Sequence, residues 1–167
     1  PRICGMIGRW YKSETERILG TAIMTETSDD VRATGACLCG AVRYQVRGPL
    51  REIIACHCSQ CRRMSGHLVA ATATARESLE ITGRESLTWF RSSPDAQRGF
   101  CAKCGSTLFW EADARDYTAI YAGSLDAGSG LTLAAHIFVG DKGDYYELTD
   151  GLPQFEGYSQ NMQVPET

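Results

Sequence analysis

Seven of the eight cysteines in this chain of 167 residues fall into three short groups, and this spacing constrains the fold more than any other feature. The groups are Cys37 with Cys39, Cys56 with Cys58 and Cys61, and Cys101 with Cys104. Closely spaced cysteines in a reduced chain are typical of metal sites, whereas disulfide frameworks are typical of secreted domains. Charged residues interrupt the apolar stretches of residues 1–23, so no secretory signal is predicted. We therefore expect a reducing, cytoplasmic compartment and cysteines that bind metal.

The charge of the chain argues against a nucleic-acid partner. The formal net charge is −3 with cysteines counted as neutral, and metal-bound thiolates would make the protein more acidic. Proteins that bind DNA or RNA need a basic surface, and the basic doublet Arg62-Arg63 is too small to provide one. No run approaches the roughly 20 apolar residues of a membrane span. We therefore expect neither a nucleic-acid partner nor a membrane partner.

The length of the chain is that of one domain. Met24 is followed by the polar residues 25–30, as at an ordinary N-terminus, and we expect it to be the native start. Residues 1–32 are then a poorly ordered extension with a short helix over 11–19, residues 33–160 form a single domain, and residues 161–167 are a tail. Cys4 lies alone in the extension, and we expect a free thiol outside the metal chemistry.

From Ala33 onward, short segments with β-strand character follow one another. Between Val42 and Val46 apolar residues alternate with polar ones, and a period of two is that of a half-buried strand. Further strands are expected over 68–74, 79–82, 87–90, 107–110, 117–121, 136–139 and 145–148, which are rich in β-branched or aromatic residues. No helical pattern is long enough to cross between parallel strands. The fold class is therefore expected to be mainly β, with mostly antiparallel sheets.

One closed site is expected from two of the groups, namely Cys37, Cys39, Cys101 and Cys104, which we call the four-cysteine group. Side chains at i and i+2 on an extended chain share a face, so Cys37 and Cys39 converge on one metal ion. The Cys-x-x-Cys spacing is that of a zinc knuckle, and Gly105 supplies the left-handed backbone that a tight turn needs. Four thiolates complete the tetrahedron that zinc prefers, so this site is expected to be structural.

An open site is expected from Cys56, Cys58 and Cys61, which we call the three-cysteine group. Three thiolates leave one position of a tetrahedral zinc ion free, as in catalytic sites. They also outweigh the charge of Zn²⁺, so this ion would be a poor acidifier of water. A thiolate-rich ion instead suits another thiol as its fourth ligand and keeps that thiol deprotonated. We therefore expect a catalytic zinc here and a substrate that contains sulfur.

Three histidines are candidates for roles beside the three-cysteine group. His57 lies between Cys56 and Cys58 and projects to the opposite face if the segment is extended. An orienting or structural role is therefore favoured for His57 over ligation. His67 and His136 are expected to be packed or hydrogen-bonded, although either could line the pocket.

The motifs around the cysteines extend well beyond the metal ligands. They are Cys37-Leu-Cys-Gly-Ala-Val-Arg-Tyr44, Cys56-His-Cys-Ser-Gln-Cys-Arg-Arg-Met-Ser-Gly66, Phe100-Cys-Ala-Lys-Cys-Gly-Ser106, Gly123-Ser-Leu-Asp126, His136-Ile and Asp150-Gly-Leu-Pro-Gln-Phe155. Over residues 35–157 the sequence resembles the glutathione-dependent formaldehyde-activating enzymes, a family that also includes centromere protein V. All seven cysteine positions agree with the family pattern, which is highly specific.

This resemblance implies a β-tent fold, in which antiparallel sheets are held together by zinc. It implies two zinc ions per chain, a structural one on the four-cysteine group and a catalytic one on the three-cysteine group, which is the partition that spacing predicts. It also implies carbon–sulfur lyase chemistry, in which glutathione and formaldehyde combine reversibly as S-hydroxymethylglutathione.

Two hypotheses of different classes result. The first is a zinc enzyme that joins or separates a thiol and a small aldehyde, with Arg62, Arg63 or Lys103 contacting the carboxylates of a glutathione-like thiol. For these cations a solvated surface position is the alternative. The second is a non-catalytic thiol-binding or protein-interaction module, in which both ions are structural and water or a histidine fills the open position. The methionine-R-sulfoxide reductases are disfavoured, because they need a redox cysteine and none follows Cys104.

Overall fold

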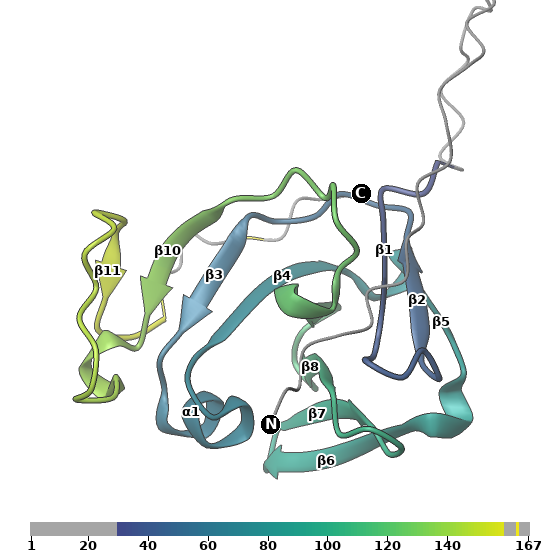
Figure 1. Cartoon of the computed structure of the whole chain (residues 1–167), viewed down its shortest axis with the longest axis horizontal. Helices are drawn as coiled ribbons and strands as arrows, with labels where there is room; N and C mark the ends of the chain where they lie inside the picture. The colour runs from purple at the N-terminus through teal and green to yellow at the C-terminus, as the bar shows by residue number, and fades with distance from the viewer. Residues whose placement is uncertain (1–29, 159–162, 164–167) are drawn as a thin grey trace, which may run out of the picture.

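The computed structural model describes residues 30–158 and 163, which form two β-sheets and one α-helix (Figure 1). Three predictions lie outside these residues: the helix over 11–19, the start at Met24 and the free thiol of Cys4. Most of the proposed extension and of the tail also lies outside them.

The smaller sheet has three strands in the order β1-β2-β5, and both pairings are antiparallel. The strands are β1 (Ala33–Ala36), β2 (Arg43–Val46) and β5 (Leu79–Thr82). The predicted alternation is present in β2, where Tyr44 and Val46 are buried. Because side chains on a strand point alternately to opposite faces, this alternation places the apolar side chains of β2 on the face that packs in the core.

The larger sheet has eight strands in the order β11-β10-β3-β4-β9-β8-β7-β6. They are β3 (Ile53–Cys56), β4 (Val69–Ala75), β6 (Leu87–Ser93), β7 (Ala96–Cys101), β8 (Thr107–Ala112), β9 (Tyr117–Tyr121), β10 (Leu133–Ile137) and β11 (Gln154–Phe155). From β3 to β6 all pairings are antiparallel, whereas β10 pairs in parallel with both β3 and β11. The expectation of a mainly β fold with mostly antiparallel sheets is confirmed.

The main hydrophobic core lies between the two sheets. It contains the inward side chains of β2, together with Leu108 and Phe109 of β8 and Ile120 of β9. The rings of Tyr44 and Phe109 meet edge to face, with centroids 5.3 Å apart. Gly35 of β1 is needed beside them, because a Cβ there would lie 2.3 Å from the Tyr44 ring. Figure 1 shows the smaller sheet at the opposite end of the molecule from β10 and β11.

The helical segments are short. The α-helix α1 (Ser59–Ser65) connects β3 to β4, and Gly66 ends it in a left-handed conformation with φ of 82°. Within the described residues there are also four 3-10 turns: η1 (Arg76–Ser78), η2 (Arg84–Ser86), η3 (Ala122–Ser124) and η4 (Val139–Asp141). Among the described residues, no helix has the length and apolar character needed to cross a membrane.

Two strand predictions need correction. Residues 145–148 form a turn and a loop rather than a strand, since the Tyr145 and Tyr146 rings pack with one another and with histidines. The strand expected over 136–139 ends at Ile137, because Phe138 takes a left-handed conformation and begins a 3-10 turn. Four strands were not predicted: β1 consists of small residues, β3 is a short apolar run, β7 contains Gly99 and a buried arginine, and β11 has only two residues.

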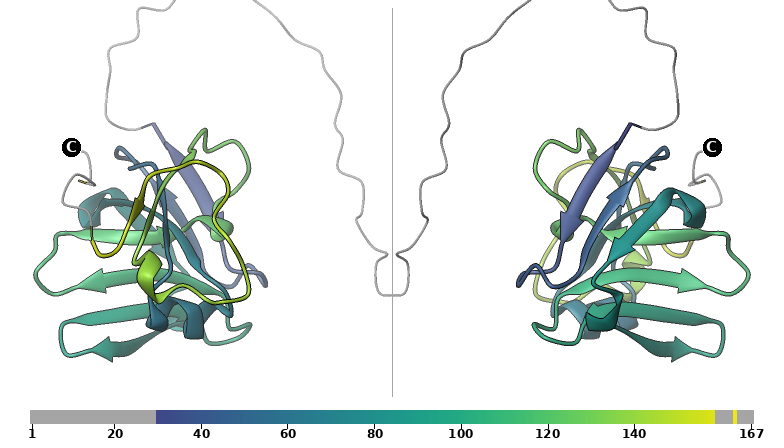
Figure 2. Two further views of the ribbon diagram at one scale, coloured as in Figure 1. Left: turned by 90° about the vertical axis from the view of Figure 1, so that its left-hand side faces the viewer. Right: turned by 90° about the vertical axis from the view of Figure 1, so that its right-hand side faces the viewer.

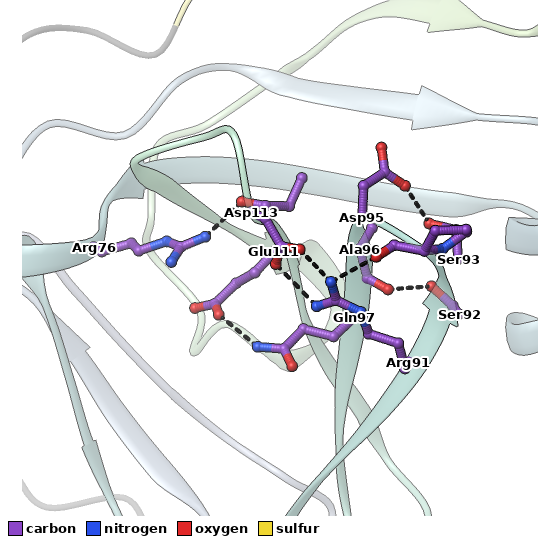
Figure 3. A network of polar contacts seen from close by, with 11 residues as sticks. Arg76, Arg91, Ser92, Ser93, Asp95, Ala96, Gln97, Glu111 and Asp113 are labelled. Atoms are coloured by element: carbon purple, nitrogen blue, oxygen red, sulfur yellow. Dashed lines mark hydrogen bonds and ion pairs between the residues drawn. The ribbon is translucent and has the colours of Figure 1, made fainter.

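The hairpins formed by β6, β7 and β8 project at one side of the molecule (Figure 2). Their ends are held by polar contacts, which Figure 3 shows from close by. Arg91 forms an ion pair with Asp113, and Gln97 donates a hydrogen bond to Glu111 over 3.1 Å. Ser93 donates to Asp95 over 2.7 Å. Of these residues, Ser93 and Asp95 also line a cavity at this side of the larger sheet.

Candidate metal centres and the adjoining cavity

The four-cysteine group comes together where the two sheets meet. Cys37 and Cys39 follow β1, whereas Cys101 ends β7 and Cys104 lies in the turn before β8. Their four sulfur atoms all lie within 4.8 Å of one another. Cys37 and Cys101 are buried in the main core, so this group joins the smaller sheet to the larger one.

Backbone turns aim the sulfurs of this group inward. Gly105 adopts a φ of 75°, as the Cys-x-x-Cys-Gly motif predicts. The Val42 N–H donates to Cys37 Sγ over 3.3 Å, and such contacts stabilise a thiolate. Hydrogen bonds from Ser106 lower the pKa of Cys104 to about 5. The turn therefore favours the deprotonated form of Cys104, which is the form that a metal ion requires.

The three-cysteine group is built at the junction of β3 and α1. Cys56 ends β3, Cys58 is the N-cap of α1, and Cys61 lies in its first turn. The Cys61 N–H donates to Cys58 Sγ over 3.4 Å, which closes the turn around the sulfurs. The three sulfur atoms lie within 4.8 Å of one another, and no histidine, aspartate or glutamate among the described residues joins them.

Hydrogen bonds among the three thiols give them different pKa values. Contacts from Cys56 and Cys61 lower the pKa of Cys58 to about 2, whereas those of Cys58 and Cys61 raise the pKa of Cys56. Arg98 of β7 is only 3% exposed and donates from Nη2 to Cys61 Sγ over 3.8 Å. A buried cation thus lies against a group that becomes anionic when its thiols ionise.

His57 points away from the three sulfurs and is fully buried. Its Nδ1 lies 2.5 Å from the Tyr146 hydroxyl, and its Nε2 lies 2.9 Å from Nδ1 of His136. His136 in turn contacts Asp150 through Nε2 over 2.8 Å, which lowers the pKa of Asp150. Burial lowers the pKa of His57 below its usual value. In the structure both histidines are therefore packed and hydrogen-bonded, the role favoured from sequence.

A cavity of about 450 Å³ adjoins the three-cysteine group, within the range usual for small-molecule sites. It lies against the larger sheet, and strands β3, β4, β7, β8, β9 and β10 all contribute to its lining. All three cysteines line it, so a molecule in the cavity could reach their sulfurs. The walls are largely apolar and aromatic, formed by residues such as Val69, Trp110, Tyr117, Tyr121, Ile137 and Phe138.

The cationic residues beside the cavity differ from those expected from the sequence. Arg62, Arg63 and Lys103 are not among the lining residues, whereas Arg51 and Arg98 are. His67 is exposed and contacts the Tyr145 hydroxyl through Nδ1 over 2.9 Å. Arg51 and Arg98 lie outside the cysteine motifs, and only the pairing of the strands brings them to the cavity. No local pattern in the sequence singles them out.

The donor sets of both groups fit zinc. Sulfur ligands about 2.3 Å from a tetrahedral zinc ion lie about 3.8 Å apart. The sulfurs of Cys37 and Cys39 are 3.6 Å apart, and those of Cys39 and Cys101 are 3.8 Å apart. No disulfide forms among the seven described cysteines. Both groups can therefore hold a thiophilic metal ion, with four protein ligands in one and three in the other.

Comparisons with known proteins agree with this description of the fold and the cysteine groups. The sequence profile of the glutathione-dependent formaldehyde-activating enzymes matches residues 32–141. An uncharacterised lyase of Schizosaccharomyces pombe is 28% identical over 123 residues, which cover 72% of this chain and 88% of that protein. A Halomonas elongata protein named for glutathione-dependent formaldehyde activation is 32% identical over 90 residues, 48% of this chain and 56% of that protein.

A solved structure supports the fold as well. A Rhodobacter sphaeroides protein superposes with a TM-score of 0.50 at 26% identity, covering 56% of this chain and 88% of that one. The fold and the site together define a class of small β proteins that carry two clusters of cysteines. Within that class, the chain belongs to the family of glutathione-dependent formaldehyde-activating enzymes.

Proposed function

We propose that the protein is a cytoplasmic carbon–sulfur lyase-type enzyme that joins or separates a thiol, such as glutathione, and a small aldehyde, such as formaldehyde. The observation that carries this proposal is the three-cysteine group, which lies at a cavity large enough for a small molecule. The names of the relatives, a lyase and a formaldehyde-activating enzyme, support the same reaction class.

In this proposal Cys56, Cys58 and Cys61 hold a zinc ion, and the four-cysteine group holds a second, structural ion. A zinc ion with three protein ligands supplies a position at which a substrate thiol is held as a thiolate. The thiol sulfur forms a bond to the aldehyde carbon, the carbonyl π pair moves to oxygen, and that oxygen takes up a proton. The proton that the thiol gives up balances this gain, and cleavage of the adduct reverses each step.

Tyr121 is suited to assist at the carbonyl oxygen. Its side chain belongs to the same apolar cluster as Cys61 and lines the cavity. Burial raises the pKa of Tyr121 to about 12, so its hydroxyl stays protonated near neutral pH. A neutral hydroxyl can donate a hydrogen bond to oxygen as negative charge develops there.

The rate at which glutathione and formaldehyde interconvert with S-hydroxymethylglutathione tests the proposal. Exchange measured by NMR should exceed the spontaneous rate with the metal-loaded protein and return to it in Cys58→Ala. Cys4→Ala, which changes a cysteine outside the three sequence groups, is the matched control and should keep full activity. Exchange that never exceeds the spontaneous rate with any thiol and aldehyde would favour the non-catalytic binding module.

A further inference from the structure

The side chains that line the cavity beside the three-cysteine group change in character from one end of the cavity to the other. Cys56 of β3 and Val69 of β4 are directly opposite each other, and both line the cavity at its sulfur end. Ile54 and Ala71 form the next pair whose side chains line it. Beyond them the lining includes Tyr117 and the cation of Arg51.

Arg51 is a poorly compensated cation in this lining. Its Nη2 donates to the Ala71 carbonyl over 3.3 Å, while its Nε is buried without a hydrogen-bond partner. No carboxylate in the described part of the chain forms an ion pair with it. Burial lowers the pKa of Arg51 below its usual value, yet arginine stays protonated in proteins. A guanidinium that is half-buried and has unused donors is a site for an anion.

The other charged residues of the cavity are committed elsewhere or solvated. Arg98 already donates to Gln60 over 3.0 Å, to Ser92 and to Cys61, although its buried Nε, like that of Arg51, has no hydrogen-bond partner. Asp95 and Asp141 also line the cavity, but both are exposed to water. Arg51 is therefore the cation best placed to bind an anionic group that enters the cavity.

The strand register gives the spacing between the sulfur end and this cation. The Arg51 guanidinium lies against Ala71, which is opposite Ile54, two residues from Cys56. At about 3.3 Å per residue, this is roughly 7 Å along the strand. The interval is lined by apolar side chains, so the segment of a ligand that crosses it needs no polar partner.

We propose that Arg51 binds the carboxylate of the substrate, so that the cavity selects thiols whose sulfur and carboxylate are separated by an apolar segment. The position of the sulfur rests on the proposed function, in which the thiol meets the three-cysteine group. The carboxylate site rests on Arg51 alone. The two parts can therefore fail separately.

Calorimetric titration of the metal-loaded protein with matched ligands tests the proposal. Mercaptohexanoic acid should bind about tenfold more tightly than mercaptohexanol, because only the acid offers a charged acceptor to Arg51. Mercaptoacetic acid, in which a single methylene separates the carboxylate from the sulfur, should show no such advantage over mercaptoethanol. Arg51→Met should remove the advantage of the longer acid over mercaptohexanol. Arg84→Met, at an exposed arginine of η2, is the matched control and should keep the advantage.

The outcomes separate the two proposals. Equal binding of mercaptohexanoic acid and mercaptohexanol by the unmodified protein would overturn the role of Arg51, whether or not the protein is an enzyme. Retention of the preference in a folded Arg51→Met variant would overturn it as well. Binding of hexanoic acid that Arg51→Met abolishes, with no binding of mercaptohexanol, would uphold the carboxylate site and contradict the thiol-binding role of the cysteines.

Discussion

Arg98 combines burial, positive charge and contact with a sulfur ligand more directly than any other described side chain of the site. Burial opposes its charge, but Tyr121 and Cys61 hold the pKa of Arg98 above its usual value. Groups that hydrogen-bond to metal ligands commonly alter metal affinity by about 10- to 100-fold. We therefore assign Arg98 the task of positioning Cys61 and offsetting the negative charge of the three thiolates.

The first prediction concerns Arg98→Met. The substitution should leave a folded protein that loses the metal ion of the three-cysteine group about tenfold faster to a chelator, since Cys61 loses its charge partner. Release can be followed with a chromogenic zinc indicator. Arg91→Met is the control, because Arg91 pairs with Asp113 at an exposed edge (Figure 3). Equal release from both variants would contradict the role of Arg98.

The second prediction compares one cysteine from each group. Cys101 is fully buried in the main core, and its replacement by serine should unfold the domain. Structural zinc can contribute on the order of 10 kcal/mol to folding, which is comparable to the whole stability of a domain. Cys58→Ser should stay folded but inactive, because a serine can still cap α1. The melting temperatures of the two variants and of the unmodified protein provide the test. If both variants melt at the temperature of the unmodified protein, the structural role of the four-cysteine group is contradicted.

At the scale of elements, β3 carries different chemistry on its two sides. Cys56 contributes to the sulfur group on the cavity side, and the next residue, His57, belongs to a buried polar chain on the other. This chain connects β3 to β10 and to the loop that contains Tyr146 and Asp150. It fixes the end of β3, where Cys56 lies and from which the chain continues to Cys58 and Cys61.

The third prediction uses two adjacent tyrosines. Tyr146→Phe should lower the free energy of unfolding by about 1–3 kcal/mol, since it leaves a nitrogen of the buried His57 without its partner. Tyr145→Phe should change it little, because the Tyr145 hydroxyl contacts His67 and both residues are exposed. Urea unfolding of the two variants provides the comparison. Equal losses would show that the buried network does not stabilise this end of β3.

At the scale of the whole molecule, the two cysteine groups constrain different parts of the structure. The four-cysteine group joins β1 of the smaller sheet to the β7–β8 turn of the larger one. The three-cysteine group gathers cysteines from only six consecutive residues at the junction of β3 and α1. The first therefore constrains the packing of the sheets, whereas the second shapes a local site beside the cavity.

The fourth prediction is that the purified protein contains two zinc ions per chain that differ in lability. A closed site with four thiolates should exchange ligands more slowly than a site with an open position. Metal analysis by mass spectrometry gives the count, and mild chelation gives the two rates. A single ion, or two ions released at one rate, would contradict the division into groups of four and three.

Local sequence patterns predicted which cysteines group together and that the fold is mainly β. The ligand spacings within each group and the alternation in β2 are local patterns. They depend only on residues that are close in sequence, so they can be recognised without knowledge of the tertiary contacts. That His57 projects away from the neighbouring cysteines could also be predicted, because neighbouring residues on an extended segment face opposite ways.

The surroundings of the three-cysteine group depend on tertiary contacts, which local sequence patterns do not contain. Arg51 comes from the segment before β3, Arg98 from β7 and Tyr121 from β9, so the packing of segments distant in sequence brings them to one cavity. The strand expected over 145–148 is a loop for the same reason, since contacts with His57 and His67 replace backbone pairing. A local pattern cannot encode these neighbours, because strand order and register depend on the packing of the whole chain.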